Sequence, residues 1–423
     1  MELTLGRVTV RNVRTGSATR IEDGELTVCV EEMTEMLRRD ARLTQVSVEL
    51  ARPGEPVRII PVKDVIQPRL KTHGPGTVFP GLGNSEAECG EGYTKVMAGV
   101  CVTTTGRIVA FQEGLIDMSG PGADYCHFSR ENHVVLVCEP AADLDPNDHE
   151  KAVRLAGIKA AGYLAEALKN AAPDQEETYR WPALPVKSLP RVVYLYQVLA
   201  QGLLHDNYLY GLNAKRTIPT LISPNELMDG ALVSGNCVTA CDKNTTHDHM
   251  NNPVIKELWE RHGQDLNFAG VILHPVSPAL ADKERNTAHA VRLARELQAD
   301  GMVITEEGGG NPETDLMLLC RRAEQAGIKT VIFLHENAGE DGRSEAITYT
   351  TPEADAVVTV GNTNEIIHLP AMERVIGHLK AADQLSGSYP GALRPDGSLA
   401  VPYAVIIDAV SNLGMTRMRA QDR

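Results

Sequence analysis

The sequence has no apolar run long enough to span a lipid bilayer. Residues 1–6 carry neither a basic segment nor a long apolar stretch, so we expect no signal peptide at the start of the chain. Basic residues are in the minority: 41 Lys and Arg stand against 56 Asp and Glu, which gives a formal net charge of -15. Because nucleic acids and anionic membranes attract clustered Lys and Arg, this balance argues against both as partners.

The sequence also lacks the cysteine pattern of a disulfide framework. Its eight cysteines are scattered along 423 residues, whereas disulfide scaffolds are short and densely cross-linked. We therefore expect reduced thiols in a cytoplasmic protein, most of them buried in hydrophobic cores. A chain of this length has room for two or three domains.

The two halves of the sequence differ in their hydrophobic pattern. Residues 1–146 contain short apolar runs of strand length, separated by turns rich in Gly and Pro, which predicts a β-rich domain. In residues 190–423, strand-like runs alternate with helical segments at intervals of roughly 30 residues, the spacing of β–α–β units. We therefore expect a mixed α/β fold in which a β-rich N-terminal domain precedes a mostly parallel α/β domain.

A helix and a linker are predicted between these two domains, over residues 147–189. The helix is expected over 147–171, with Asn147 or Asp148 as its N-cap and an Ala-rich body. The stretch 172–185 is polar and interrupted by proline, which is typical of a linker.

A polar segment near the middle of the chain contains an Asn–Cys step. The thiol of Cys237 can attack the carbonyl of Asn236 and convert that amide into a thioester. β-Elimination would then break the chain after Asn236 and leave a dehydroalanine, which hydrolyses to a pyruvoyl group. Gly235 permits strained backbone geometry at this step. His247 is a nearby group for proton transfer, and we expect Asp242 either to orient His247 or to take the Cα proton itself.

The same segment admits two other interpretations. Two cysteines and two histidines, Cys237, Cys241, His247 and His249, have a spacing that can serve a zinc ion. Both cysteines can equally be inert core residues. The residues alone leave these three interpretations open.

Polar residues follow several predicted strands of the α/β domain. These candidates are Glu306, Glu307, His335 and Asn362. Because ligands bind beyond the carboxyl ends of the strands in open α/β sheets, we expect these residues to bind a substrate that carries an ammonium group. The alternative is that they are solvated loop residues.

The glycine-rich turn 308–310 follows a predicted strand and opens a predicted helix. Asn311 can cap that helix, Pro312 suits its first turn, and Glu313 places negative charge at its positive end. A phosphate would be repelled there, so we interpret this turn as a helix start and not as a phosphate site.

Two adjacent pairs resemble a catalytic base beside a second functional group. They are His205–Asp206 and Cys126–His127. Because neighbouring side chains on a helix or strand point apart, we interpret both pairs as structural.

Many segments, in order along the whole chain, share the pattern of one known family. They are residues 48–55, 61–66, 106–114, 116–121, 201–206, 228–231, 235–246, 251–255, 305–308 and 310–312. With them the chain resembles the pyruvoyl-forming proprotein of component B of glycine, sarcosine and betaine reductases. The resemblance is specific because the matches are long and spread from end to end.

The resemblance implies self-cleavage between Asn236 and Cys237 inside the α/β domain. The resulting pyruvoyl group would be the covalent cofactor, with no metal, and would capture the substrate amine as a Schiff base. The implied reaction is a selenol-dependent reductive deamination that releases ammonia and leads to acetyl phosphate. The implied partners are the selenocysteine-containing subunit of component B, selenoprotein A and, downstream, component C, in a cytoplasmic hetero-oligomer.

The substrate amine stays open at this stage. Glycine is slightly favoured over sarcosine and betaine, and the matching motif does not separate the three. The alternatives are the similar D-proline reductase proprotein and an unprocessed scaffold subunit without catalytic activity.

Overall fold

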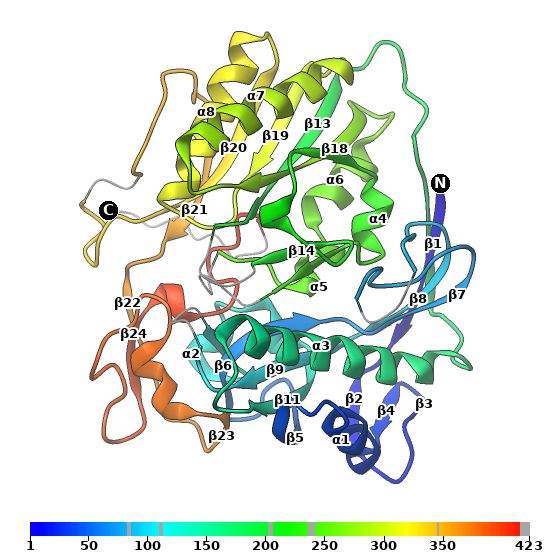
Figure 1. Cartoon of the computed structure of the whole chain (residues 1–423), viewed down its shortest axis with the longest axis vertical. Coiled ribbons are helices and arrows are strands. Elements are labelled where there is room, and N and C mark those ends of the chain that lie inside the picture. The colour runs from blue at the N-terminus through cyan, green and yellow to red at the C-terminus, as the bar shows by residue number, and fades with distance from the viewer. Residues whose placement is uncertain (83–85, 110–112, 202–205, 236–241, 345–346, 415–423) are drawn as a thin grey trace.

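The computed structural model describes residues 1–423 except 83–85, 110–112, 202–205, 236–241, 345–346 and 415–423. Figure 1 shows an α/β part in its upper half and a group of β-sheets in its lower half, with α3 running across the latter. Within the described ranges, no helix is both long and apolar enough to cross a membrane.

The N-terminal strand belongs to a four-stranded sheet with the order β12-β1-β8-β7. Its strands are β1 (Glu2–Thr9), β7 (Arg69–His73), β8 (Gly92–Ala98) and β12 (Gln175–Arg180). β12 pairs antiparallel with β1, so the linker expected over 172–185 is wrong for these residues. β12 is an edge strand, and all of its residues are exposed or half-buried, which is why polar side chains are tolerated there.

A second sheet forms the centre of the β-rich part, in the order β10-β6-β9-β11-β5. Its strands are β5 (Leu43–Ala51), β6 (Val57–Ile66), β9 (Val100–Gly106), β10 (Gly114–Asp117) and β11 (Asn132–Pro140). A smaller sheet and a helix pack beside it: β2 (Asn12–Thr15), β3 (Arg20–Glu22), β4 (Glu25–Val28) and α1 (Val30–Arg38).

Helix α3 (Pro146–Ala165) covers one face of this central sheet, where its alanines pack against apolar residues of β6, β9 and β11. The short helix η2 (Glu166–Leu168) continues it. The N-cap is Asp145, whose carboxylate accepts hydrogen bonds from the backbone N–H groups of Asn147 (2.9 Å) and Asp148 (3.2 Å). The N-cap therefore lies two or three residues earlier than the predicted Asn147 or Asp148, because Pro146 suits the first position of the helix.

The C-terminal part of the chain covers the other face of the same sheet. Strand β23 (Arg374–Gly377) pairs parallel with β6, and apolar side chains from Val360 to Val410 join one core with β6, β9 and β10. The elements that accompany this segment are β22 (Ile366–Leu369), η4 (Leu379–Gln384), β24 (Leu399–Pro402), η5 (Tyr403–Val405), α2 (Gly120–Ala123) and η1 (His127–Arg130). The division into domains at 146 and 190 stays a prediction.

The α/β part contains a six-stranded sheet in the order β16-β18-β13-β19-β20-β21. Its strands are β13 (Arg191–Leu199), β16 (Thr220–Ile222), β18 (Asn267–Val276), β19 (Gly301–Thr305), β20 (Lys329–Glu336) and β21 (Val357–Asn362). Every neighbouring pair is parallel except β16–β18. The mostly parallel sheet predicted from the sequence is therefore confirmed.

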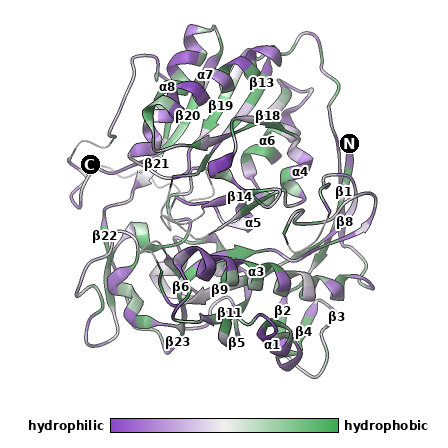
Figure 2. Ribbon diagram, in the orientation of Figure 1, coloured by the Kyte–Doolittle hydropathy of each residue, from purple (hydrophilic) through white to green (hydrophobic). Residues whose placement is uncertain are grey.

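Both faces of this sheet are apolar, as alternate residues of β13 show. Val193 and Leu195 join the core under α7 (Leu280–Glu296) and α8 (Asn311–Gln325), whereas Tyr194 and Tyr196 face α6 (Pro253–Arg261). Figure 2 shows hydrophilic colour on the outer surfaces of α7 and α8 and hydrophobic colour on the strands beneath them.

The turn before α8 is a helix start, as predicted. The N-cap is Gly310, with φ of +71°, and the Glu313 carboxylate accepts a hydrogen bond from the Gly310 N–H at 3.2 Å. The cap expected at Asn311 is wrong, since Asn311 is the first residue of the helix itself.

Short elements fill the space between the two parts of the molecule. They are β14 (Asn207–Leu209), β15 (Leu212–Asn213), η3 (Ala214–Arg216), α4 (Pro224–Met228), β17 (Leu232–Ser234) and α5 (Thr246–Met250). Strand β17 ends, and α5 begins, on either side of the Asn–Cys step. These two elements therefore position the candidate site.

Candidate functional site

The Asn–Cys step lies outside the described residues. This applies to Asn236, Cys237 and Cys241, and also to His205 of the His205–Asp206 pair. The nearest described residues are Gly235 on one side, whose backbone N–H donates to the Asp206 carbonyl at 2.8 Å, and Asp242 on the other.

The two ends of the segment are in direct contact. The Thr246 hydroxyl accepts a hydrogen bond from the backbone N–H of Ser234 at 3.0 Å and donates to the Asp64 carboxylate at 2.7 Å. The backbone N–H of Thr246 donates to the same carboxylate at 2.9 Å. One threonine therefore joins the described ends of the segment 235–245 and ties them to β6, and we call this segment the closed loop.

Lys243, a residue of this closed loop, is fully buried. The Lys243 ammonium donates to Ser234 Oγ (2.8 Å), Asn207 Oδ1 (3.0 Å) and the Asn244 carbonyl (3.1 Å), and it lies 3.5 Å from Glu307 Oε1. Its three donors are thereby used, which offsets the cost of burying its charge.

Glu307, expected to bind substrate, is occupied by two backbone N–H groups and one side-chain amide. Its carboxylate accepts hydrogen bonds from Leu199 N (2.7 Å), Asn207 Nδ2 (2.8 Å) and Asn244 N (3.1 Å). It thus fastens the end of β13 to the loop that holds the Asn–Cys step. The geometry gives Glu307 a positioning part.

The two histidines of the zinc interpretation do not face one another. Both ring nitrogens of His249 are engaged, with the Tyr196 hydroxyl at 2.7 Å and Asn207 Oδ1 at 3.0 Å. His247 instead packs against the ring of Phe128, with centroids 5.1 Å apart. A shared zinc ion would require His249 to give up a buried hydrogen bond.

Asp242, the first described residue after the Asn–Cys step, pairs with His335. Asp242 Oδ2 lies 3.2 Å from His335 Nε2, while Oδ1 has no partner among the described residues. Burial, with the nearby Glu307 carboxylate, raises the pKa of Asp242 to about 8, and burial lowers the pKa of His335 to about 4. Both groups therefore favour their neutral forms near pH 7, and the partnership expected between Asp242 and His247 is not the one formed.

Glu306 lies near Asp242 and His335, and its carboxyl group has no hydrogen-bond donor among the described residues. It is 1% exposed, and neither carboxyl oxygen has a hydrogen-bond partner within the described part of the chain. Burial and the neighbouring Glu313 and Asp242 raise its pKa well above the usual range. A carboxyl group that is buried without a donor is costly, so such groups are candidates for function.

Asn412 completes the cluster and could not be found from the sequence. Its amide donates to the Glu306 carbonyl at 2.8 Å and lies 3.4 Å from His335 Nδ1, while its Oδ1 has no partner in the described ranges. Glu306, Asp242 and Asn412 thus each offer an unpartnered oxygen that can accept a hydrogen bond, and a protonated carboxyl group among them can also donate one. We call these three residues and His335 the acceptor cluster.

Asn362, the fourth residue expected to bind substrate, holds the chain after β20. Its Oδ1 accepts from Ala338 N (3.1 Å) and Asn364 N (3.2 Å), and its amide donates to the Gly339 carbonyl at 2.8 Å. Of the four candidates at the strand ends, the structure therefore brings together Glu306 and His335. Glu307 and Asn362 bind backbone groups nearby.

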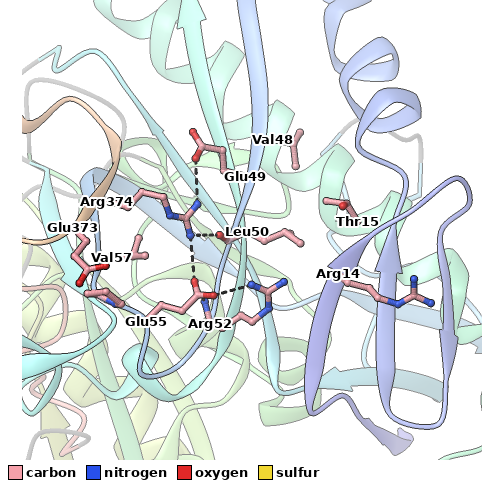
Figure 3. Close-up of a pocket in the computed structure, with 11 residues that line it drawn as sticks. Arg14, Thr15, Val48, Glu49, Leu50, Arg52, Glu55, Val57, Glu373 and Arg374 are labelled. Carbon is pink, nitrogen blue, oxygen red and sulfur yellow. Dashed lines mark hydrogen bonds and ion pairs between the residues drawn. The ribbon is translucent and has the colours of Figure 1, made fainter.

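A hollow of about 750 Å³ on the β-rich part is lined by charged side chains that pair with one another (Figure 3). The Arg374 guanidinium contacts Glu49 (3.4 Å), Glu55 (3.2 Å) and the Leu50 carbonyl (2.6 Å), and Arg52 contacts Glu55 at 2.7 Å. Because these charges compensate one another, this hollow is a weaker candidate than the acceptor cluster.

Comparison with known proteins gives a consistent result over the whole chain. A family model described as glycine/sarcosine/betaine reductase component B subunits matches residues 1–421. The chain is 46% identical over 428 residues to the glycine reductase complex component B subunits alpha and beta of Acetoanaerobium sticklandii, with both chains fully covered. It is also 46% identical over 426 residues to the sarcosine reductase complex component B subunit alpha of Peptoclostridium acidaminophilum, again with full coverage.

The D-proline reductase proprotein PrdA of Acetoanaerobium sticklandii is a more distant relative. It is 21% identical over 350 residues, which cover 76% of this chain and 52% of that protein. The comparison therefore favours the first family over the D-proline alternative. No solved structure matches the chain.

Proposed function

The chain belongs to the family of glycine/sarcosine/betaine reductase component B subunits, and on this premise we propose that it is a proprotein that cleaves itself between Asn236 and Cys237. The family makes it a component of an oxidoreductase. Cleavage would convert Cys237 into a pyruvoyl group, the electrophile that captures the substrate amine.

One structural observation carries this proposal: the Asn–Cys step lies in a loop whose two ends are fastened together. Thr246 joins the ends through Ser234, and Lys243 and Glu307 secure the inside of the loop. Restricting the backbone in this way lowers the entropic cost of bringing a thiol to the preceding carbonyl. It also keeps the two new chain ends together after the bond breaks.

The cleavage chemistry needs proton transfers at two points. The Cys237 thiol loses a proton as sulfur attacks the Asn236 carbonyl, and the amide nitrogen gains one as the C–N bond breaks. The Cα proton is then lost as the Cβ–S bond breaks, which leaves a thiocarboxylate on Asn236 and dehydroalanine at 237. Water converts these to a carboxylate with release of sulfide, and to a pyruvoyl group with release of ammonia.

We assign the proton transfers to Asp242. It is the nearest described acid to the Asn–Cys step, and its raised pKa allows it to hold or release a proton near neutral pH. The neutral His335 imidazole, 3.2 Å away, would position the Asp242 carboxyl group. The part expected of His247, a slower cleavage in His247→Ala, stays a prediction.

The acceptor cluster is proposed to receive the substrate ammonium group. Its unpartnered oxygens would accept N–H donors from the amine before it joins the pyruvoyl carbonyl. Glycine and sarcosine carry such N–H groups, whereas the quaternary nitrogen of betaine has none. This chemistry favours glycine or sarcosine as substrate, and glycine remains the first choice.

The reaction that follows would take place with partner proteins. Withdrawal of electrons by the imine would open the substrate methylene to a selenolate, which forms a C–Se bond as the methylene C–N bond breaks. Water would then hydrolyse the nitrogen left on the pyruvoyl group, which releases ammonia and restores the carbonyl. The selenolate would come from a selenocysteine-containing subunit of component B and from selenoprotein A, and component C would complete the route to acetyl phosphate. The relatives' names place them in multi-subunit complexes, which supports a hetero-oligomer.

The first test is intact-mass spectrometry of the purified protein. By proportional length, cleavage of the 45.9 kDa chain should give fragments of roughly 25 and 20 kDa, the larger being N-terminal. The smaller fragment should lack a free amino group and should gain the mass of labelled glycine after treatment with borohydride.

Two matched cysteine variants make this test decisive. Cys237→Ala should remain intact, whereas Cys241→Ala should cleave as the wild type does. A Cys237→Ala protein that still splits at this bond would sink the mechanism. A wild-type chain that stays intact but binds its complex would support the scaffold alternative.

A further inference from the structure

Three segments far apart in the sequence place ligand-type atoms together outside the acceptor cluster. His127 at the start of η1, Asp248 in α5 and Asp408 after η5 each offer one atom, and these atoms lie within 4.8 Å of one another. His127 Nε2 is 3.2 Å from Asp248 Oδ1 and 2.8 Å from Asp408 Oδ2. We call these three residues the His127 cluster.

Both carboxylates of this cluster face the same imidazole nitrogen. The Asp248 Oδ2 atom caps α5 by accepting from Thr245 N (2.8 Å) and Thr245 Oγ1 (2.6 Å). Its Oδ1 atom and Asp408 Oδ2 both face the single Nε2 atom of His127. Two carboxylates that are 0% and 1% exposed thus converge on one ring nitrogen, an arrangement that needs a cation between them, either the protonated imidazole or a bound metal ion.

A second histidine points at the same place without a partner of its own. His247 is 8% exposed, and its Nδ1 atom makes no hydrogen bond to the described residues. That atom lies 3.6 Å from Asp248 Oδ1, and the His247 and His127 rings are 5.8 Å apart. The His247 Nδ1 atom is thus buried, unpartnered among the described residues and directed at the cluster, which is the position expected of a fourth metal ligand.

We propose that the His127 cluster, with His247 as a fourth side chain, binds a divalent transition-metal ion. Atoms that share one ion at bonds of about 2.1 Å lie about 3 to 3.5 Å apart, close to the 2.8, 3.2 and 3.6 Å observed here. Two imidazoles with two carboxylates suit zinc, manganese or iron, whereas calcium and magnesium prefer oxygen ligands throughout.

The ion would stabilise the position of α5, the helix that begins directly after the closed loop. It would join α5, which follows the Asn–Cys step, to η1 of the β-rich part and to the segment that carries Asp408. No bond is made or broken at the ion, so its part is structural. The proposal does not depend on self-cleavage.

The test is metal analysis of the untagged, full-length protein, purified without chelator and dialysed against metal-free buffer. We expect about one zinc, manganese or iron ion per chain in the wild type. Asp408→Asn and His127→Gln keep the size of each side chain and should each lose the ion. His378→Ala, which removes an exposed histidine paired with Glu139, is the matched control and should keep it.

The same measurement on Cys237→Ala separates this proposal from the proposed function. Metal content should be unchanged there although cleavage is lost, and a chelator should lower the melting temperature of the wild type and of Cys237→Ala but not of Asp408→Asn. A wild type that holds no ion after incubation with zinc, manganese or ferrous salts would overturn the proposal. The two carboxylates would then share a proton.

Discussion

The raised pKa of Asp242 affects both the proposed cleavage chemistry and the stability of the fold. Its carboxyl group is 2% exposed, faces a neutral imidazole and lies near Glu307 and Glu306. The folded chain therefore retains a proton on Asp242 at a pH where an exposed aspartate has lost it. This has a measurable effect on stability.

We expect the stability of the fold to fall as pH rises from about 4 to about 8 through Asp242. In that window the folded state binds a proton that the unfolded state has released, so the free energy of unfolding decreases with rising pH, by about 1.4 kcal/mol for each unit by which the pKa is raised. Asp242→Asn removes this titration. Urea unfolding at about pH 5 and about pH 8 should thus show a smaller loss of stability in the variant than in its parent.

The comparison is best made in the Cys237→Ala background, so that cleavage does not change the unfolding reaction. Asp396→Asn, at an exposed aspartate bonded to Ser398, is the control and should keep the pH dependence of the parent. An Asp242→Asn chain with the full pH dependence would show that Asp242 ionises normally in the fold.

Some of the site residues were predictable from the sequence and others were not. Glu306 follows β19 and His335 lies near the carboxyl end of β20 in one parallel sheet, so the topology alone brings them to one edge. Asn412 reaches the same place from a distant segment, and no periodicity in the sequence indicates it. His247 was expected to work with Asp242 because the two are close in sequence, yet α5 turns its ring toward Phe128.

At the scale of elements, α5 shows how a helix of five residues is held in place. The Thr245 and Asp248 side chains form a capping box, and Thr246 bonds both Asp64 and Ser234. So short a helix has little stability of its own. Its position depends on these polar contacts.

We expect Thr246→Val to lower the free energy of unfolding by about 1 to 3 kcal/mol, because it leaves a buried carboxylate oxygen and the Ser234 N–H without partners. It should also slow cleavage, since the two ends of the loop are no longer joined. Urea unfolding and time-resolved gels would measure the two effects. Thr220→Val, at a half-buried hydroxyl bonded only to Ile218 within the described contacts, is the control, and equal stability loss in both variants would contradict the argument.

The elements themselves were predicted unevenly. Strands of the parallel sheet were found because each is a buried apolar run between turns. Strand β12 was taken for a linker because all its residues except Tyr179 are polar, a composition that an edge strand tolerates. The pairing of β23 with β6 joins residues more than 300 apart, and local sequence carries no signal for it.

For the whole molecule, the position of the Asn–Cys step relative to the strands determines how the two cleavage fragments share the β-sheets. Strand β13 comes before the step, yet it pairs along nine residues with β18 and along five with β19, which both come after it. In return, β23 comes after the step and pairs with β6, which comes before it. Each fragment would thus complete a sheet of the other.

We therefore expect the two fragments to co-purify after cleavage. Size-exclusion chromatography in native buffer should give one peak that contains both, and they should separate only in denaturant. The cleaved chain should unfold in a single transition with Cys237→Ala as the uncleaved reference. Ready separation of the fragments in native buffer would show that the halves are independent and that the shared sheet is wrong.

The shared strands also decide which halves end up together in a cell that makes several such proteins. Because β13 lies between two strands of the other fragment, exchanging fragments between molecules would mean unfolding the α/β core. Each pair would consequently consist of two pieces of one translated chain, in a ratio of one to one. Both halves of each cleaved protein would then have the amine preference encoded by one gene. Hybrids between a glycine-type half and a sarcosine-type half would not form by exchange of fragments.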